Sequence, residues 1–280
     1  MTAQTDDLRA QLHGMWGSVA SGWDRHADYV DARGTHLTER MLELCELSKE
    51  DRVLELACGP GSVGLAAATR AGDVVISDVA PEMTAIAARR AEALGLDNVT
   101  ARSLDLEAID EANDSFDAVV VREGLMLVPD PVRAAGEIAR VLREGGRVAA
   151  AVWGPQERNP WLGIVFDSVG AELGAPVPPP GIPGPFSLSD ATRLASVLSD
   201  GGLTDVNVEE LSVPMAAASF DEWWTRSTAL AGPLAKLLAN LPDETHTAIQ
   251  ARAREAARAY ESADGLDFPG MTLLASARPA

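Results

Sequence analysis

The segment 53–61, with the sequence VLELACGPG, constrains the fold of this chain more than any other feature. Its apolar residues predict a short buried strand, and Gly59 and Gly61 allow a tight turn in which the backbone can approach a ligand. Ser62 is a candidate N-cap for a helix over 63–70. The order strand, glycine turn, helix is typical of the first unit of a doubly wound nucleotide-binding fold.

The residues around the turn also indicate which nucleotide it holds. Gly59, Gly61 and Gly64 fit the dinucleotide pattern G-x-G-x-x-G, but their neighbours argue against NAD. Glu55 would place a costly buried carboxylate beneath a pyrophosphate, and Pro60 lacks the N–H that a pyrophosphate would use. S-adenosylmethionine (SAM) carries an ammonium and a sulfonium and has no phosphate. The segment therefore favours SAM over a dinucleotide.

The sequence E-x-A-C-G-P-G at 55–61 resembles motif I of the class I SAM-dependent methyltransferases. It is most similar to their small-molecule, ubiquinone/menaquinone-biosynthesis methylase-like (type 11) group, although Ala57 stands where that group usually has glycine. The resemblance and the alternation of predicted strands and helices imply an α/β, doubly wound, Rossmann-like fold. We expect a seven-stranded, mostly parallel sheet with an antiparallel final strand, plus helical cover insertions.

Further cofactor residues are expected at the ends of the next strands. Asp78 ends the second predicted strand, where a carboxylate can accept hydrogen bonds from both ribose hydroxyls, although it could also merely cap the following helix. Val79 and Met83 are placed to sandwich the adenine. By the resemblance, Asp105 accepts the adenine amino group and the Leu106 backbone reaches the ring. The predicted cofactor-binding residues are Trp23, Glu55, Ala57, Gly59, Gly61, Asp78, Val79, Met83, Asp105, Leu106 and Arg122.

The rest of the chain predicts a cover over this core. We expect an N-terminal helical lid (1–50), a SAM-binding core (51–154), a first cover insertion (155–186), a continuation of the core (187–218), a helical cover insertion (219–263) and a final core strand (264–280). By the resemblance, Trp23 and Tyr29 line the cleft; alternatively, they pin the helices to the core. The insertions are rich in apolar and aromatic residues, which favours a small apolar or aromatic acceptor such as a quinol, a phenol or a secondary metabolite. Alternatively, both insertions simply add core.

Composition excludes several other classes of protein. The net charge of −19 would repel a phosphate backbone, so nucleic-acid substrates are disfavoured. Cys45 and Cys58 lack the spacing of a disulfide or a metal site, which predicts no metal and a reduced, cytoplasmic setting. The N-terminus lacks the layout of a signal peptide, and no apolar run is long enough for a membrane span. The oligomeric state is not predicted.

The expected reaction places few demands on the protein. In methyl transfer from SAM the cofactor supplies the electrophile, so a base is needed only if the acceptor must lose a proton. His26, beside the predicted lid, is the first candidate and Glu123, at the sheet edge, is the second. The Arg122 backbone could meet the methionine end of SAM. Two other functions stay open: an NAD(P)-dependent oxidoreductase or epimerase, and a SAM-binding protein without catalysis.

Overall fold

The structure is a computed structural model that describes the backbone of residues 3–280 and the side chains of residues 14–280. Its strands are β1 (Arg52–Leu56), β2 (Asp73–Asp78), β3 (Val99–Ser103), β4 (Phe116–Arg122), β5 (Leu142–Trp153), β6 (Leu203–Ser212), β7 (Met215–Ala217), β8 (Glu261–Ser262), β9 (Gly265–Phe268) and β10 (Met271–Pro279). Its helices are α1 (Ala3–Arg25), α2 (Ala27–Cys45), α3 (Ser62–Ala68), α4 (Pro81–Ala93), α5 (Pro131–Val141), α6 (Pro160–Leu173), α7 (Ala191–Asp200), α8 (Phe220–Leu230), α9 (Pro233–Ala239) and α10 (Asp243–Ala257). Three short 3₁₀ turns cover Leu125–Leu127, Gln156–Arg158 and Arg258–Tyr260.

A seven-stranded sheet in the order β3-β2-β1-β4-β5-β10-β6 forms the centre of the molecule. The strands from β3 to β5 pair in parallel, and β10 runs antiparallel between β5 and β6. Val119, Val120 and Val121 in β4 are fully buried, as expected for a parallel strand that is covered on both faces. The predicted doubly wound, Rossmann-like fold with an antiparallel final strand is confirmed.

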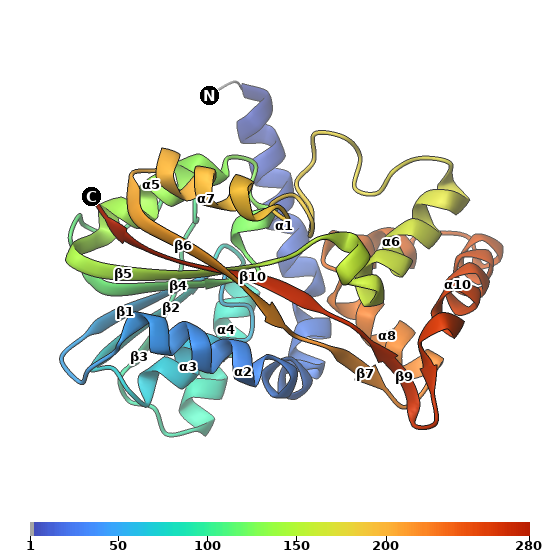
Figure 1. Ribbon diagram of the computed structural model, residues 1–280, viewed down its shortest axis with the longest axis horizontal. Coiled ribbons are helices and arrows are strands. Elements are labelled where there is room, and N and C mark those ends of the chain that lie inside the picture. Colours follow the sequence, from blue (N-terminus) through green and yellow to red (C-terminus); the bar gives the residue numbers. More distant parts are fainter. Residues whose placement is uncertain (1–2) are drawn as a thin grey trace.

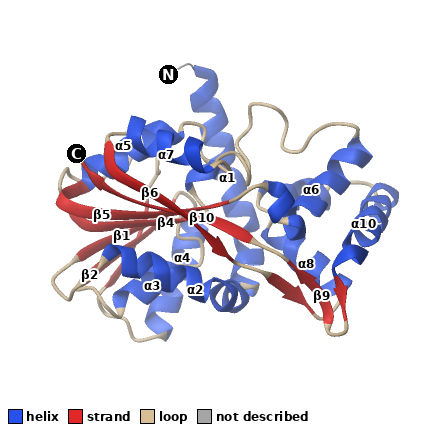
Figure 2. Cartoon of the chain, viewed as in Figure 1, coloured by secondary structure: helices blue, strands red, loops and turns tan. Residues whose placement is uncertain are grey.

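Helices cover both faces of this sheet, and a second body extends beyond its carboxyl edge. Helices α2, α3 and α4 lie on one face and α5 and α7 on the other (Figure 1). The second body contains α6, α8, α9, α10 and a small sheet in the order β7-β9-β8 (Figure 2). Helix α1 packs against α4 of the core and against α8 and α9 of the second body. It therefore bridges the two parts of the molecule.

The structure differs from the predicted boundaries in the second body. Residues 264–280 hold two strands, because β9 pairs with β7 and β8 in the small sheet and only β10 joins the main sheet. The segment 187–218 likewise ends in β7 of the small sheet. Helix α10 ends at Ala257, before the predicted insertion boundary at residue 263, because a short 3₁₀ turn and β8 follow it. Residues 1 and 2 of the predicted lid lie outside the described residues.

Two negative findings apply to the part of the chain that the structure describes. Within it, no helix combines the length and the apolarity that crossing a bilayer requires. The same part contains no group of histidine, cysteine and acidic side chains arranged to hold a metal ion.

Candidate active site

The glycine turn is built around the buried carboxylate of Glu55. Its Oε1 accepts a hydrogen bond from the Val63 amide (3.1 Å) and its Oε2 accepts one from the Gly64 amide (2.8 Å), both in the first turn of α3. A Cβ at Gly64 would lie 2.5 Å from Glu55 Oε2, so this contact requires glycine. The predicted N-cap Ser62 is wrong: Gly61 is the cap residue, and the Ser62 hydroxyl has no hydrogen-bond partner among the residues that the structure describes.

Glu55 therefore occupies the position where a helix N-terminus would otherwise bind an anion. Amides of this first turn are the donors that bind the pyrophosphate in dinucleotide-binding folds. Here two of them already donate to a carboxylate of the chain itself. Burial raises the pKa of Glu55 to about 7, and hydrogen bonds from Gly64 and Val63 act in the opposite direction. The turn is thus poorly suited to a pyrophosphate.

Asp78 is fixed at the carboxyl end of β2, directly beside this turn. Its Oδ2 accepts from the Gly59 amide (3.0 Å) and its Oδ1 from the Ala80 amide (2.9 Å). Burial raises the pKa of Asp78, and the amide hydrogen bonds oppose that rise. Asp78 does not cap α4, because the N-cap residue there is Ala80. The backbone thus holds both carboxylate oxygens of Asp78 in place, and their remaining lone pairs can accept hydrogen bonds from hydroxyl groups.

A cavity of about 120 Å³ opens between this turn and the ends of the neighbouring strands. Ten of the predicted cofactor residues line it: Trp23, Glu55, Ala57, Gly59, Asp78, Val79, Met83, Asp105, Leu106 and Arg122. Gly61 does not line it. With φ of +89°, Gly61 shapes the turn, and a Cβ there would lie 2.9 Å from the Cβ of Ala87 in α4. Ala57 has φ of +49°, a conformation that favours glycine.

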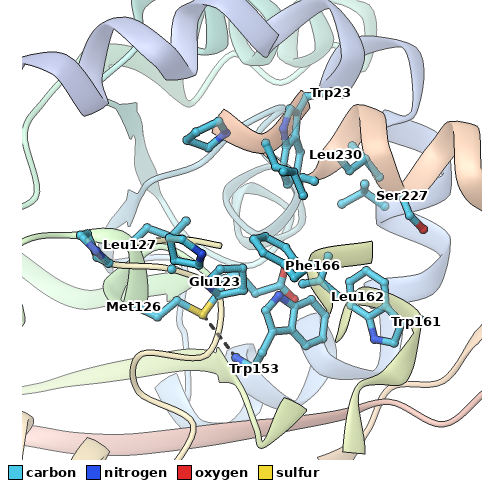
Figure 3. Close-up of a pocket in the computed structure, with 18 of the residues that line it drawn as sticks. Trp23, Glu123, Met126, Leu127, Trp153, Trp161, Leu162, Phe166, Ser227 and Leu230 are labelled. Atoms are coloured by element: carbon cyan, nitrogen blue, oxygen red, sulfur yellow. Dashed lines mark hydrogen bonds between the residues drawn. The ribbon is translucent and has the colours of Figure 1, made fainter. Parts of the chain in front are cut away.

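A second, larger cavity of about 300 Å³ lies next to the first and is mainly apolar. Helix α6 of the first insertion supplies Trp161, Leu162 and Phe166, and the proline-rich loop that follows contributes residues 177–185. Helices α8 and α9 of the other insertion supply a further wall that includes Leu230. Figure 3 shows these side chains converging on one space from different elements. Both insertions therefore face a cavity rather than adding only core.

Five residues line both cavities and so mark the place where they meet: Trp16, Trp23, Arg122, Glu123 and Leu127. Glu123 follows β4 in a left-handed conformation with φ of +60°, and its amide donates to the Ala151 carbonyl (2.7 Å). Its side chain lines the larger cavity together with Phe166 and Trp153 (Figure 3). Burial raises the pKa of Glu123, while Arg122 and Arg33 act in the opposite direction.

The predicted catalytic candidates and lid aromatics have different outcomes. His26 lies at the break between α1 and α2 and lines neither cavity. Burial, followed by Arg25 and Arg226, lowers its pKa. The structure thus does not bring His26 to the site, whereas it does bring Glu123. Trp23 lines both cavities and Tyr29 lines the larger one, as the cleft interpretation expected.

Sequence reasoning missed part of the larger cavity. The guanidinium of Arg33 in α2 lies 4.8 Å from the ring centre of Trp153 and 4.3 Å from that of Trp161. Trp153 ends β5, at the sheet edge where ligands of such folds bind, and this position could have identified it. No local pattern marks Arg33, because its surroundings come from distant segments.

Comparison with known proteins agrees with this geometry. The methyltransferase domain family matches residues 53–146. An uncharacterised protein of Mycobacterium tuberculosis is 38% identical over 110 residues, which cover 39% of this chain and 40% of that protein. The ubiquinone/menaquinone biosynthesis C-methyltransferase of Bdellovibrio bacteriovorus is 30% identical over 159 residues, covering 56% of this chain and 67% of that enzyme.

The fold agrees as well. The crystal structure of the YcgJ protein from Bacillus subtilis matches with a TM-score of 0.62 at 20% identity, covering 88% of this chain and 99% of that one. The chain spans about two fifths of the length of the curated relatives that match first. Its match to two thirds of the Bdellovibrio enzyme, together with the domain match and the fold, shows that it belongs to the class I SAM-dependent methyltransferases.

Proposed function

We propose that this chain transfers the methyl group of SAM to a small, apolar or aromatic acceptor. The observation that carries the proposal is the meeting of two unlike cavities at Glu123. The smaller cavity has acidic side chains beside the glycine turn, and the larger is apolar and built by the cover insertions. A methyl donor in the first and an acceptor in the second would have their reacting atoms at the junction.

The residues of the smaller cavity fit SAM better than a dinucleotide. We assign the ribose hydroxyls to Asp78, whose two oxygens are already held in place by backbone amides. Val79 and Met83 offer apolar surface for the adenine, and Asp105 and Leu106 line the same end of the cavity. Glu55 satisfies the first amides of α3, which removes the anion site and leaves acidic character suited to a cationic ligand.

The chain's part in the reaction is alignment, exclusion of water and, where the acceptor carries an ionisable proton, its removal. Bound SAM supplies an activated methyl group for in-line displacement. Trp16 and Trp23 of α1 line both cavities, so the lid can shield the junction from water. Glu123 is our candidate proton acceptor, because it lies at the junction and burial raises its pKa towards the range useful at neutral pH.

The apolar lining supports an acceptor of the quinol or phenol type. This agrees with the name of the Bdellovibrio relative, a ubiquinone/menaquinone biosynthesis C-methyltransferase. The atom methylated is left open. A SAM-binding protein without catalysis is the remaining alternative, since the chemistry forces no catalytic residue. The oxidoreductase alternative is disfavoured by the position of Glu55.

Two measurements test the proposal. Calorimetry with SAM, S-adenosylhomocysteine and NAD should give binding of the first two only, and retention of NAD without SAM would refute the cofactor assignment. Incubation with methyl-labelled SAM and a panel of quinols, phenols and aromatic acids should then transfer label to at least one acceptor. SAM binding without transfer to any member would favour the non-catalytic alternative.

A further inference from the structure

Arg33 is held in the wall of the larger cavity by contacts from three separate segments of the chain. It lies on α2, and its guanidinium packs against the rings of Trp153 at the end of β5 and Trp161 in α6. Its Nε donates to the Pro214 carbonyl (3.3 Å) and its Nη2 to the Val213 carbonyl (3.1 Å), both between β6 and β7. These contacts fix the plane of the guanidinium.

The remaining donors of Arg33 have no partner in the described part of the chain. A guanidinium carries one N–H on Nε and two on each Nη. The contacts with Pro214 and Val213 use Nε and one N–H of Nη2, which leaves both N–H groups of Nη1 and one of Nη2. Arg33 makes no ion pair with a carboxylate of the described chain. Burial lowers the pKa of Arg33, with Glu123 acting in the opposite direction.

The charge balance of the larger cavity is unusual for so acidic a protein. Its charged lining residues are Arg33, Arg122 and Glu123, so cations outnumber anions there although the whole chain carries −19. Arg122 donates to the Thr38 hydroxyl (3.0 Å) and, like Arg33, forms no ion pair with a described carboxylate. A desolvated cation is costly unless an anion pairs with it. Arg122 also lines the smaller cavity, where it acts on Glu55, whereas Arg33 lines only the larger cavity.

We propose that Arg33 binds a carboxylate of the acceptor, so that the larger cavity selects an apolar or aromatic acid. A planar guanidinium with donors on both Nη atoms matches the two oxygens of a carboxylate, and the surrounding apolar walls fit the rest of such a molecule. Arg33 does not line the smaller cavity, so the carboxylate of SAM itself is not its partner. The inference rests on the proposed function, because it assigns the larger cavity to the acceptor.

The test compares an aromatic acid with its neutral analogue. 2-Naphthoate and 2-naphthamide have the same ring system and nearly the same shape, but only the first is anionic at neutral pH. Each is titrated by calorimetry into the full chain saturated with S-adenosylhomocysteine. We expect wild type to bind naphthoate at least about tenfold more tightly than naphthamide, as a charge-assisted bidentate contact implies. Arg33→Gln should remove most of that preference while leaving naphthamide binding unchanged.

Two further variants make the result specific. Arg158→Gln removes an exposed arginine that pairs with Glu210 outside the cavity, and it should keep the full preference. Arg33→Lys keeps the positive charge but lacks the planar guanidinium, so its preference for naphthoate over naphthamide should be intermediate. This variant replaces Arg33→Gln in the test if the Arg33→Gln protein does not fold. Equal affinities in wild type, no binding of either probe, or an undiminished preference in the Arg33 variants would each overturn the inference. If the wild-type protein does not bind S-adenosylhomocysteine at all, that result would instead refute the proposed function.

Discussion

Glu55→Gln should make the stability of this protein less sensitive to a rise in pH, although it removes a charge that accepts two backbone hydrogen bonds. The reason is that burial of the Glu55 carboxylate outweighs the hydrogen bonds from Val63 and Gly64. Its pKa rises from the ordinary 4.5 to about 7. At about 1.4 kcal/mol per pKa unit, this rise amounts to about 3 kcal/mol.

The sign of the effect follows from proton linkage. The folded state holds the Glu55 proton more tightly than the unfolded state, so the contribution of this group is greatest below pH 4.5 and is lost as the pH rises to about 7. Glutamine resembles the protonated acid in shape and cannot ionise, but its NH2 group cannot accept a hydrogen bond, so one of the Val63 and Gly64 amides loses its partner at every pH. We therefore expect the Glu55→Gln protein to be less stable than wild type by about 1–3 kcal/mol at pH 4. Between pH 4 and pH 8 wild type should lose up to about 3 kcal/mol that the Glu55→Gln protein keeps, so the difference should close or reverse.

Urea unfolding followed by circular dichroism between pH 4 and pH 8 measures this difference. Glu50→Gln is a matched control, because it makes the same change of side chain at an exposed residue in the loop just before β1. A Glu55→Gln protein that is less stable than wild type by the same amount at pH 4 and pH 8 would refute the reasoning. That outcome would mean that the hydrogen bonds from the amides of α3 fully offset the burial of the charge.

The remaining predictions concern ligand binding and turnover. Asp78→Asn should weaken S-adenosylhomocysteine binding by about 10- to 100-fold in calorimetry, because hydrogen bonds to a charged group contribute about 1.5–3 kcal/mol. For an acceptor that must lose a proton, Glu123→Gln should lower the turnover number by about 100-fold or more while S-adenosylhomocysteine affinity stays at the wild-type value; equal turnover would remove Glu123 from the mechanism. His26→Ala should leave the turnover number unchanged, because His26 lines neither cavity; a large loss would restore His26 as the base.

Local sequence patterns predicted the core strands, the glycine turn and Asp78, and the family resemblance added Trp23, Asp105 and Leu106 to the residues that line the smaller cavity. A strand that is buried on both faces of a sheet is a continuous run of apolar residues in the sequence. Tight turns are marked by glycine, which adopts backbone conformations that other residues rarely adopt. The glycine turn and Asp78 could therefore be placed from spacing alone, since each lies at the end of a predicted strand. The seven-stranded, mostly parallel sheet with an antiparallel final strand agrees with the prediction.

Features made by distant segments could not be predicted in the same way. Arg33 acquires its surroundings from β5, α6 and the link between β6 and β7, and nothing adjacent to it in sequence indicates them. The small sheet is a similar case, because its strands have as few as two residues and take their identity only from pairing. The error at Ser62 has a related cause: a serine before a helix normally caps it, but a carboxylate from the preceding strand had taken that role.

The Glu55 carboxylate explains how the same kind of glycine turn can bind SAM in one protein and a dinucleotide in another. In a dinucleotide-binding fold the amides at the start of the first helix remain available for the pyrophosphate. Here Glu55 reaches the Val63 and Gly64 amides from within β1, and glycine at position 64 leaves the space for it. A phosphate at this point would have to displace an internal ligand and then lie beside its charge. The choice between SAM and a dinucleotide thus depends less on the overall negative charge of the site than on the Val63 and Gly64 amides, which already donate to Glu55.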